Sequence, residues 1–227
     1  MSQETAEPRY IAVEGVIGVG KTTFARMLAE RIGAEILNEE VFENPFLVDF
    51  YKNRKRYAFP CQLYFLISRF QQQQQLVVRD LFAQRIVADY LYAKDAIFAS
   101  VTLSERELVL YNKIAPVLTR DIPRPDLVIY LQARTGILLD RIRRRNFAFE
   151  KTIDQEYLEV LNKAYDYYFF HYTETPLLVV KTDDIDFVHT PEHFDDLIDQ
   201  IRKPMVGKKY YSPAGDLKTR PQQDYVG

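Results

Sequence analysis

The stretch GVIGVGKTT, residues 15–23, decides the fold, because it follows an apolar run at 10–14 and leads into the amphipathic segment FARMLAERI. It fits the pattern G-x-x-x-x-G-K-[ST], whose fixed positions are Gly15, Gly20, Lys21 and Thr22. The backbone N–H groups of such a loop wrap around a phosphate, since glycine lets the chain approach it closely. The order strand, loop, helix therefore predicts a nucleotide-binding loop.

Two side chains of this loop have predicted roles of their own. Lys21 is expected to reach the β- and γ-phosphates, and the Thr22 hydroxyl is expected to ligate Mg²⁺. The helix that follows would point its positive N-terminal end at the anion. A glycine turn without a ligand is the alternative interpretation. The residues predicted to bind ATP are Gly15, Val16, Ile17, Gly18, Val19, Gly20, Lys21, Thr22 and Thr23.

Composition narrows the class of protein. The 227 residues, 47% of them hydrophobic, suffice for one domain with a substantial core. A net charge of −2 supplies no basic field, so a nucleic-acid polymer is not expected as a partner. The single cysteine, Cys61, excludes a disulfide framework and suits a reducing compartment. Without an apolar run near the ~20 residues of a membrane span, or an N-terminal targeting pattern, we expect a cytoplasmic protein without a membrane partner.

Apolar runs alternate with helical patterns along the chain, which predicts an α/β fold: a parallel sheet of about five strands with helices on both faces. The strand-like runs are 10–14, 34–37, 85–88, 126–131 and 177–181. The expected helices are 21–33, 45–52, 60–82, 103–118, 135–145, 154–170 and 190–202. Pro60 suits a first helical turn, and the glutamine run 71–75 reads as an exposed helical turn.

The domain organisation follows from the same pattern. Residues 10–202 form a single domain, preceded by a flexible N-terminal segment, 1–9. From about Lys203 the sequence is polar and rich in Pro and Gly, which predicts a flexible C-terminal tail over 203–227. Docking of the tail's tyrosines on the body or on a neighbouring subunit is the alternative.

Two carboxylates fall at the carboxyl ends of predicted strands, where ligands gather in parallel sheets. Glu39 follows the run 34–37, and Asp89 closes the run 85–88. Asp126 opens its strand at the opposite edge and is discarded. Phosphoryl transfer to a hydroxyl needs one carboxylate to take the proton and often another to hold Mg²⁺. Glu39 and Asp89 are the candidates, unless either merely caps a helix.

A cluster of arginines marks a second feature, DRIRRRNFAFE, at 140–150. Guanidinium groups match phosphate oxygens bidentately and can stabilise a transferring phosphoryl group. The cluster predicts a mobile lid over about 141–152 that closes on the donor nucleotide. A solvated basic turn is the alternative. The arginines are Arg141, Arg143, Arg144 and Arg145.

Together these motifs resemble the deoxynucleoside kinase family, especially its bacterial deoxyadenosine/deoxyguanosine kinase branch, over about residues 10–201. The most specific part is NEEVFENPFLVDFYKNRKRYAFPCQLYFLISRF, residues 38–70. It is similar to the family pattern E-P-V-x-E-N-P…F-Y…F-x-x-Q-x-x-x-x-x-x-R. The resemblance implies a P-loop kinase fold, a homodimer, and Mg²⁺-dependent transfer of the ATP γ-phosphoryl group to the 5′-hydroxyl of a deoxynucleoside.

The resemblance also implies roles for acceptor-site residues. Glu39 falls on the general base, and Tyr51 on the tyrosine that touches the sugar 3′-hydroxyl. Gln62 falls on the glutamine that bonds the base edge, with Arg69 as its companion. A spacing of seven places Gln62 and Arg69 on one helix face.

The lid matches as well. Arg141 and Arg145 occupy its R-I-x-x-R positions, and Glu150 falls on the glutamate that reaches the sugar. Asp95 matches an acidic residue that helps to read the base. Because the segment after it is one residue shorter than usual, Lys94 is a rival alignment.

Three departures from the family pattern stand out. The family's E-P-V reads Glu39-Glu40-Val41, so a stiffening proline is missing. In the Asp/Glu-Arg-Ser motif Tyr90 replaces the phosphate-facing arginine, although Asp89 keeps the carboxylate. Phe147 stands at the third lid arginine. The resemblance thus leaves Lys21, Mg²⁺ and the remaining arginines to stabilise the transition state, with Arg69 or Arg144 as candidate substitutes.

Deoxyadenosine is the first candidate acceptor, with deoxyguanosine and deoxycytidine as alternatives. A nucleoside monophosphate kinase, such as a thymidylate kinase, shares the fold and the donor loop but needs a basic residue where Tyr90 stands. A non-catalytic kinase-like nucleotide-binding subunit, and a P-loop regulator that switches partners, are the remaining alternatives.

Overall fold

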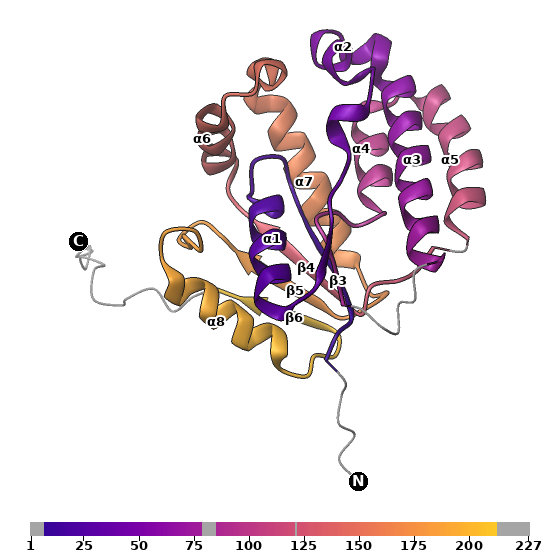
Figure 1. Ribbon diagram of the computed structural model, residues 1–227. Helices are drawn as coiled ribbons and strands as arrows, with labels where there is room; N and C mark the ends of the chain where they lie inside the picture. Colours follow the sequence, from indigo (N-terminus) through magenta and orange to yellow (C-terminus); the bar gives the residue numbers. More distant parts are fainter. Residues whose placement is uncertain (1–6, 79–84, 121, 213–227) are drawn as a thin grey trace, which may run out of the picture.

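The computed structural model describes residues 7–78, 85–120 and 122–212 (Figure 1). Six parallel strands form one sheet in the order β2-β3-β1-β4-β5-β6. They are β1 (Tyr10–Gly15), β2 (Glu35–Leu37), β3 (Ile86–Ala88), β4 (Leu127–Gln132), β5 (Leu177–Lys181) and β6 (Lys208–Tyr211). The α/β prediction is confirmed, with one strand more than expected.

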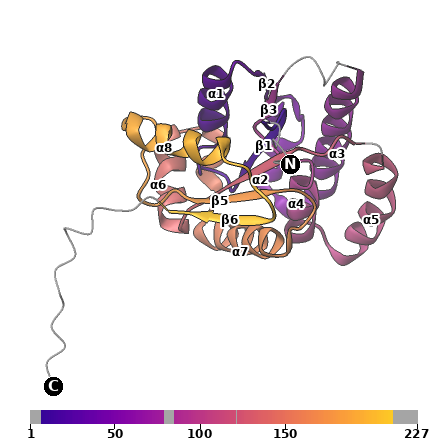
Figure 2. The same ribbon diagram turned by 90° about the horizontal axis from the view of Figure 1, so that it is seen from below.

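Helices cover both faces of the sheet. In Figure 2, α1 and α8 lie on one face, and α4 and α7 lie on the other. The helices are α1 (Lys21–Ile32), α2 (Leu47–Lys52), α3 (Arg54–Val78), α4 (Lys94–Thr102), α5 (Glu105–Thr119), α6 (Thr135–Arg145), α7 (Gln155–His171) and α8 (Pro191–Arg202). Two 3₁₀ turns, η1 (Val41–Glu43) and η2 (Ala148–Thr152), lie at the top of Figure 1.

The central strand positions the donor loop. All six residues of β1 are buried, as expected for a parallel strand covered on both faces. Its register with β3 and β4 brings the carboxyl ends of these strands to one edge of the sheet. The loop that follows β1 therefore opens at the edge where ligands bind in such folds.

Helix α1 is held in place by aromatic packing. The Phe24 side chain is fully buried, and its ring meets Phe187 at 5.3 Å and Phe194 of α8 at 5.9 Å, both edge to face. The helix ends at Gly33, whose φ of 64° is the left-handed conformation that glycine adopts without strain. These contacts fix the direction in which the N-terminal end of α1 points.

Two helix predictions are corrected. Helix α3 begins at Arg54, before the expected start at Pro60, because Asn53 Oδ1 accepts the Arg56 N–H at 3.2 Å and caps an earlier turn. Pro60 consequently lies inside the helix. Helix α4 was not expected at all; its charged residues Lys94 and Asp95 are buried while small Ala96 and Ser100 are exposed, so the sequence shows no polar face with a helical period.

The glutamine run is also more buried than its sequence indicates. Gln72 and Gln73 are 6% and 0% exposed, so the prediction of an exposed turn is wrong for both. Gln72 donates a hydrogen bond to Asn38 O at 3.1 Å. Gln73 donates to the hydroxyls of Tyr10 and Tyr90, each at 3.2 Å. A buried amide is tolerated because these partners satisfy its donor group.

The predicted tail contains structure. Residues 208–211 form β6, which pairs with β5 from Leu177↔Lys208 to Val180↔Tyr211, so the prediction of a flexible tail is wrong for this stretch. The Tyr211 hydroxyl bonds Asp196 of α8, in line with the alternative that the tyrosines dock on the body. An edge strand can be polar because only part of it is covered by other elements. Its sequence then lacks the apolar run from which a strand is predicted. Residues 213–227, like 1–6, lie outside the described residues.

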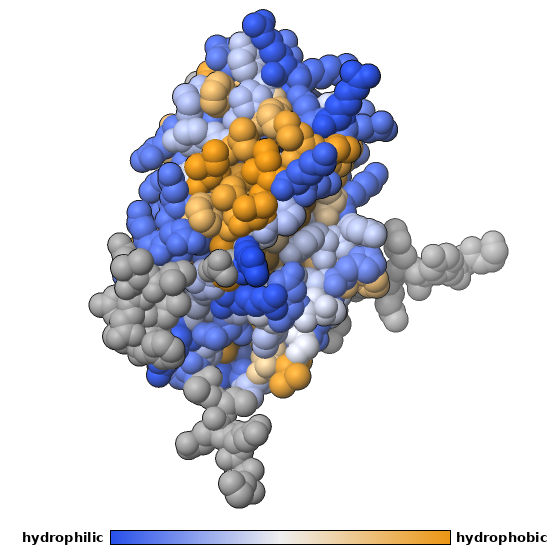
Figure 3. All heavy atoms as spheres, turned by 90° about the vertical axis from the view of Figure 1, so that its right-hand side faces the viewer, coloured by the Kyte–Doolittle hydropathy of each residue, from blue (hydrophilic) through white to orange (hydrophobic). Residues whose placement is uncertain are grey.

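One face of the molecule carries an apolar patch. Figure 3, which shows the right-hand side of Figure 1, contains an extended hydrophobic patch on the side of α3 and α5. The exposed large apolar side chains of these two helices are Ile67, Val109, Leu110 and Val117. No helix in the described part of the chain is long and apolar enough to cross a membrane.

Candidate active site

The donor loop depends on close backbone approach. Gly18 and Gly20 have φ of 86° and 104°, in the left-handed region that favours glycine. A Cβ at Gly18 would lie 2.8 Å from Leu138 O and 2.7 Å from Ile142 Cγ1 of α6. The loop is therefore pressed against the helix that carries the predicted lid arginines.

Lys21 and Thr22 lie where the motif predicts. Lys21 Nζ donates to Gly15 O at 2.6 Å and to Val16 O at 3.3 Å, which brings its ammonium back across the loop. Burial first, and then the nearby Lys94 ammonium, lower the pKa of Lys21 to about 8. An anion bound in the loop would relieve both effects.

Thr22 and Asp89 form the expected pair. Thr22 Oγ1 donates to Asp89 Oδ2 at 2.7 Å, which joins the start of α1 to the end of β3. Asp89 Oδ1 accepts the Glu39 N–H at 2.6 Å and so fixes the segment after β2. A hydroxyl and a carboxylate supply the hard oxygen ligands that suit Mg²⁺. Neither acid caps the helix after it, because the caps of η1 and α4 are Glu40 and Ala93.

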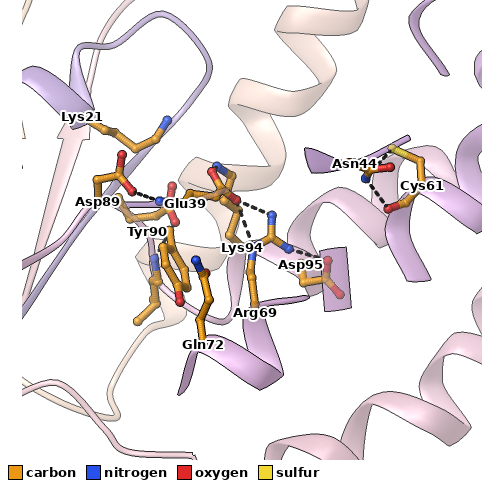
Figure 4. A network of polar contacts seen from close by, with 12 residues as sticks. Lys21, Glu39, Asn44, Cys61, Arg69, Gln72, Asp89, Tyr90, Lys94 and Asp95 are labelled. Atoms are coloured by element: carbon orange, nitrogen blue, oxygen red, sulfur yellow. Dashed lines mark hydrogen bonds and ion pairs between the residues drawn. The ribbon is translucent and has the colours of Figure 1, made fainter. Parts of the chain in front are cut away.

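An ion network surrounds Glu39, and Figure 4 shows its ionised members Glu39, Arg69, Lys94 and Asp95 pointing toward one another. Arg69 of α3 donates to Glu39 Oε1 through Nε at 3.0 Å and Nη2 at 2.5 Å. Its Nη1 donates to Asp95 Oδ1 at 2.5 Å, and the Tyr111 hydroxyl donates to Asp95 Oδ2 at 2.7 Å. Lys94 Nζ donates to Glu39 Oε2. Four separate elements thus supply one buried network.

The network keeps Glu39 ionised. Burial alone would raise the pKa of this carboxyl, but Lys94 and Arg69 outweigh it and lower the pKa to about 2. The side chain is only 6% exposed. At neutral pH Glu39 is therefore a carboxylate that can accept a proton, provided that the reacting hydroxyl becomes acidic enough to give it up.

The Tyr90 side chain points away from the donor loop. Its side chain is fully buried, its hydroxyl accepts from Gln73, and Figure 4 shows its ring pointing away from Lys21. Tyr90, which replaces the family arginine, is thus packed in the core and does not line the cavity.

A cavity of about 440 Å³ joins the two parts of the site. It is lined by Lys21, Thr22 and Asp89 and by every predicted substrate residue except Asp95, which lies behind Arg69. Gln62 is 2% exposed, and its Oε1 has no hydrogen-bond partner among the described residues. A buried, unpaired amide oxygen on a cavity wall is suited to accept a hydrogen bond from a ligand. The predicted substrate residues on the wall are Glu39, Tyr51, Gln62, Arg69 and Glu150.

Aromatic side chains make the rest of the wall. Tyr51 and Phe149 lie 5.6 Å apart, and Phe42 contacts Phe147 at 5.5 Å and Phe149 at 5.9 Å, edge to face. These contacts join η1 and α2 to the segment after α6. Flat apolar walls with a few polar groups are typical of sites for a planar heterocycle.

The lid region folds onto the cavity. Asn146, with φ of 54°, ends α6. Arg145 Nε then donates to Glu150 Oε2 at 3.1 Å, and its guanidinium lies 4.9 Å from the centre of the Phe147 ring. Arg145 and Glu150 therefore reach the cavity together.

Arg141 lies elsewhere. Its guanidinium donates to Val19 O at 3.0 Å and Thr182 O at 2.9 Å, so it ties the donor loop to the end of β5. Arg141 and Arg144 line a second cavity of about 640 Å³, between α6 and the segment 183–193, on the other side of the loop. Of the two predicted lid arginines, Arg141 lines only this second cavity, whereas Arg145 lines both.

Cys61 is part of the wall but not of the chemistry. Asn44 Nδ2 donates to Cys61 O at 3.0 Å, and burial raises the pKa of the thiol to about 12. The thiol is protonated and unreactive at neutral pH. This agrees with its interpretation as a small buried side chain.

Sequence reasoning missed Glu14 and the role of Lys94. Glu14 is fully buried at the end of β1 and accepts the backbone N–H groups of Gly15 and Leu91, each at 2.8 Å. It thereby joins the donor loop to the segment after β3. The sequence does contain a sign of this role, because Glu14 is an acidic residue in an otherwise apolar strand. Lys94 entered the sequence analysis only as a rival to Asp95.

Comparison with known proteins gives a consistent result. The chain matches the deoxynucleoside kinase family over residues 11–206. It is 38% identical over 204 residues to a deoxyguanosine kinase of Bacillus subtilis (strain 168), covering 87% of this chain and 98% of that protein. It is also 38% identical over 170 residues to a deoxyadenosine kinase of Dictyostelium discoideum, covering 73% and 68%.

A solved structure shares the architecture. The deoxyadenosine kinase from M. mycoides with bound dATP superposes with a TM-score of 0.74 at 26% identity, covering 86% of this chain and 100% of that one. The same enzyme with bound dCTP gives a TM-score of 0.70. The P-loop kinase fold is thereby confirmed. With this match over most of its length, the chain belongs to the deoxynucleoside kinase family and is an ATP-dependent deoxynucleoside kinase.

Proposed function

We propose that this kinase transfers the γ-phosphoryl group of MgATP to the 5′-hydroxyl of a purine deoxynucleoside, with Glu39 as the base. One observation carries the proposal: Glu39 lines the same cavity as the donor residues Lys21 and Thr22 and the acceptor residues Gln62 and Tyr51. A hydroxyl in this cavity can reach Glu39 while it faces a phosphate held by the loop.

The reaction conserves atoms and charge in a simple way. The 5′-oxygen forms a bond to the γ-phosphorus, the bond from that phosphorus to the bridging oxygen breaks, and ADP leaves. The hydroxyl proton goes to a Glu39 carboxylate oxygen. Because the pKa of Glu39 is about 2, the transfer occurs late, when the forming O–P bond has made the hydroxyl strongly acidic.

The donor side of the proposal uses the loop and the pair beside it. Backbone N–H groups of 15–20 and the Lys21 ammonium hold the β- and γ-phosphates. Thr22 and Asp89 would hold Mg²⁺, which when bound neutralises charge on the β- and γ-oxygens. The second cavity, lined by Arg141 and Arg144, accommodates the remainder of ATP.

The acceptor side selects a nucleoside. Tyr51 and Glu150 are assigned to the sugar, and Gln62, with Arg69 on the wall and Asp95 behind it, to the base edge. The Gln62 amide can donate and accept, which suits either purine. The printed activities of the two relatives, deoxyguanosine kinase and deoxyadenosine kinase, support a purine over deoxycytidine. Arg145 closes over the γ-phosphoryl group as the lid arginine.

A homodimer through the apolar face of α3 and α5 completes the proposal. Figure 3 shows an apolar patch on the side of these helices, whose exposed large apolar side chains are Ile67, Val109, Leu110 and Val117, and a second copy can cover such a patch. Covering this patch would bury one side of α3, the helix that carries Gln62 and Arg69. A reducing compartment such as the cytoplasm suits the free thiol of Cys61.

The test is an ATP-consumption assay with Mg²⁺ against deoxyadenosine, deoxyguanosine, deoxycytidine, thymidine and their monophosphates. Turnover of deoxyadenosine or deoxyguanosine, at least about tenfold above the pyrimidines in kcat/KM, is expected. Turnover of a monophosphate alone would contradict the proposal and favour a nucleoside monophosphate kinase. Bound ATP without turnover of any acceptor would contradict it in favour of a non-catalytic nucleotide-binding protein.

A further inference from the structure

Lys94 is held where a positive charge is costly. It is 7% exposed, and buried lysines are rare. It is the first residue of α4, at the helix end whose partial charge is positive. A second ammonium, that of Lys21, lines the same cavity.

Not all N–H donors of the Lys94 ammonium are used in hydrogen bonds. Among the described residues, Glu39 alone accepts from its Nζ, which also lies 5.8 Å from the centre of the Phe98 ring. An ammonium has three N–H donors. Arg69, by contrast, commits Nε and Nη2 to Glu39 and Nη1 to Asp95. All three nitrogens of Arg69 are thus bonded to carboxylates on two sides, whereas the Lys94 ammonium is bonded to one carboxylate and has two further N–H donors for a ligand.

Its place beside Glu39 also puts Lys94 near the reacting atoms. The hydroxyl that loses its proton must lie about 2.6–3.2 Å from a Glu39 oxygen. Lys94 Nζ is bonded to Oε2 of that carboxylate and lies on the cavity wall. With Oε2 as the oxygen that accepts the proton, the ammonium is within roughly 6 Å of the attacking oxygen, a gap that a flexible lysine side chain can close.

We propose that Lys94 is a catalytic residue: its ammonium passes from Glu39 to an oxygen of the transferring γ-phosphoryl group as the acceptor attacks. The proposal rests on the function proposed above. Lys94 only donates hydrogen bonds and keeps its protons, while the hydroxyl proton goes to Glu39 and ADP leaves. The movement stabilises charge on the phosphoryl oxygens and uncovers Glu39 Oε2 for the proton. It supplies the positive charge that Tyr90, bonded to Gln73, does not.

The first experiment compares Lys94→Gln with the wild type and with Lys163→Gln, a change at an exposed lysine of α7. In Lys94→Gln we expect kcat to fall by about 10²–10³, as for the loss of one donor to a transition-state oxyanion. The Kd values for deoxynucleoside and MgATP should change less than about threefold, because the interaction forms in the transition state. Lys163→Gln should match the wild type. A kcat of Lys94→Gln within about threefold of the wild type would overturn the proposal.

The second experiment separates a catalytic from a structural role. Lys94→Met, which keeps the aliphatic stem, is combined with Glu39→Gln, so that no uncompensated carboxylate remains in the pair. Binding of MgADP and deoxynucleoside is then measured with and without aluminium fluoride, a mimic of the transferring group. Relative to Glu39→Gln alone, we expect at least about tenfold weaker binding of the fluoride complex and little change without fluoride. Equal effects in both complexes, or none, would overturn the proposal.

The two proposals fail in different ways. If the proposed function is wrong, the wild type turns over no deoxynucleoside, and the role of Lys94 falls with it. If only the role of Lys94 is wrong, the wild type turns over a deoxynucleoside and Lys94→Gln retains its kcat.

Discussion

The part of the active site assigned to ATP, the donor half, and the part assigned to the nucleoside, the acceptor half, are built from different kinds of polar groups. The donor half is one continuous stretch, 15–22, in which backbone N–H groups, glycine conformations and a lysine bonded to its own loop prepare a place for phosphate. The acceptor half is a set of ionised side chains from the segment after β2, from α3 and from α4, one of which also accepts a hydrogen bond from the Tyr111 hydroxyl of α5. Each neutralises another across the interior.

This difference indicates which kind of substitution each half tolerates least. The donor half depends on shape, because a single methyl group would strike the neighbouring backbone. The acceptor half depends on charge balance, because removing one member leaves its partner buried and unpaired. Substitutions that separate shape from charge therefore test the comparison.

The largest effect is expected from Glu39→Gln. The amide has nearly the shape of the carboxylate but cannot take the proton, so kcat should fall by about 10³ or more. Deoxynucleoside binding, measured by calorimetry, should weaken by less than about fivefold, because the cavity wall is retained. Glu40→Gln, at the exposed neighbour, is the control and should keep wild-type kcat. Loss of binding in proportion to kcat would show that Glu39 holds the nucleoside and is not the base.

Arg145→Ala tests the lid, which contacts both halves. Arg145 reaches the cavity with Glu150, so its removal should lower kcat by about 10²-fold through loss of positive charge on the phosphoryl group. Nucleoside binding should change much less. The control is Arg143→Ala, whose arginine is exposed and pairs with Asp140 on the surface at 3.6 Å. An unchanged kcat in Arg145→Ala would show that the lid interpretation is wrong.

A smaller and more selective effect is expected from Gly18→Ala. The added Cβ would meet Leu138 O at 2.8 Å, at a φ of 86° that alanine rarely adopts. We expect about tenfold weaker MgATP binding and about 1–3 kcal/mol lower stability, with nucleoside affinity unchanged. Gly136→Ala in α6, where a Cβ meets nothing within 4 Å, is the matched control. Equal weakening of nucleoside binding would show that the two halves are not independent.

The same contrast explains what could be predicted from the sequence. The donor loop, its helix and the pairing of Thr22 with Asp89 follow from one contiguous motif and from the rule about strand ends. Glu39 was a candidate from the strand-end rule and from the resemblance, whereas Tyr51, Gln62 and Arg69 were assigned by resemblance alone; all four line one cavity.

What could not be predicted depends on distant parts of the chain. Nothing near Lys94 in the sequence indicates that it meets Glu39, and nothing near Gln73 indicates that it holds Tyr90. Helix α4 shows no helical period because its charged residues are buried against other elements, and β6 is polar because it forms an edge. In each case the contacts come from residues that are distant in the sequence and become neighbours only in the folded chain.

The place of β6 has a consequence for how the molecule is made. On one side of the central strand, β4, β5 and β6 are added outward in the order of the chain. During synthesis, β5 emerges well before its last partner and presents a row of unpaired backbone groups to solvent. This edge is closed only when residues 208–211 leave the ribosome. A nascent kinase thus passes through a stage in which its nucleotide-binding loop is complete while its sheet can still pair with another chain.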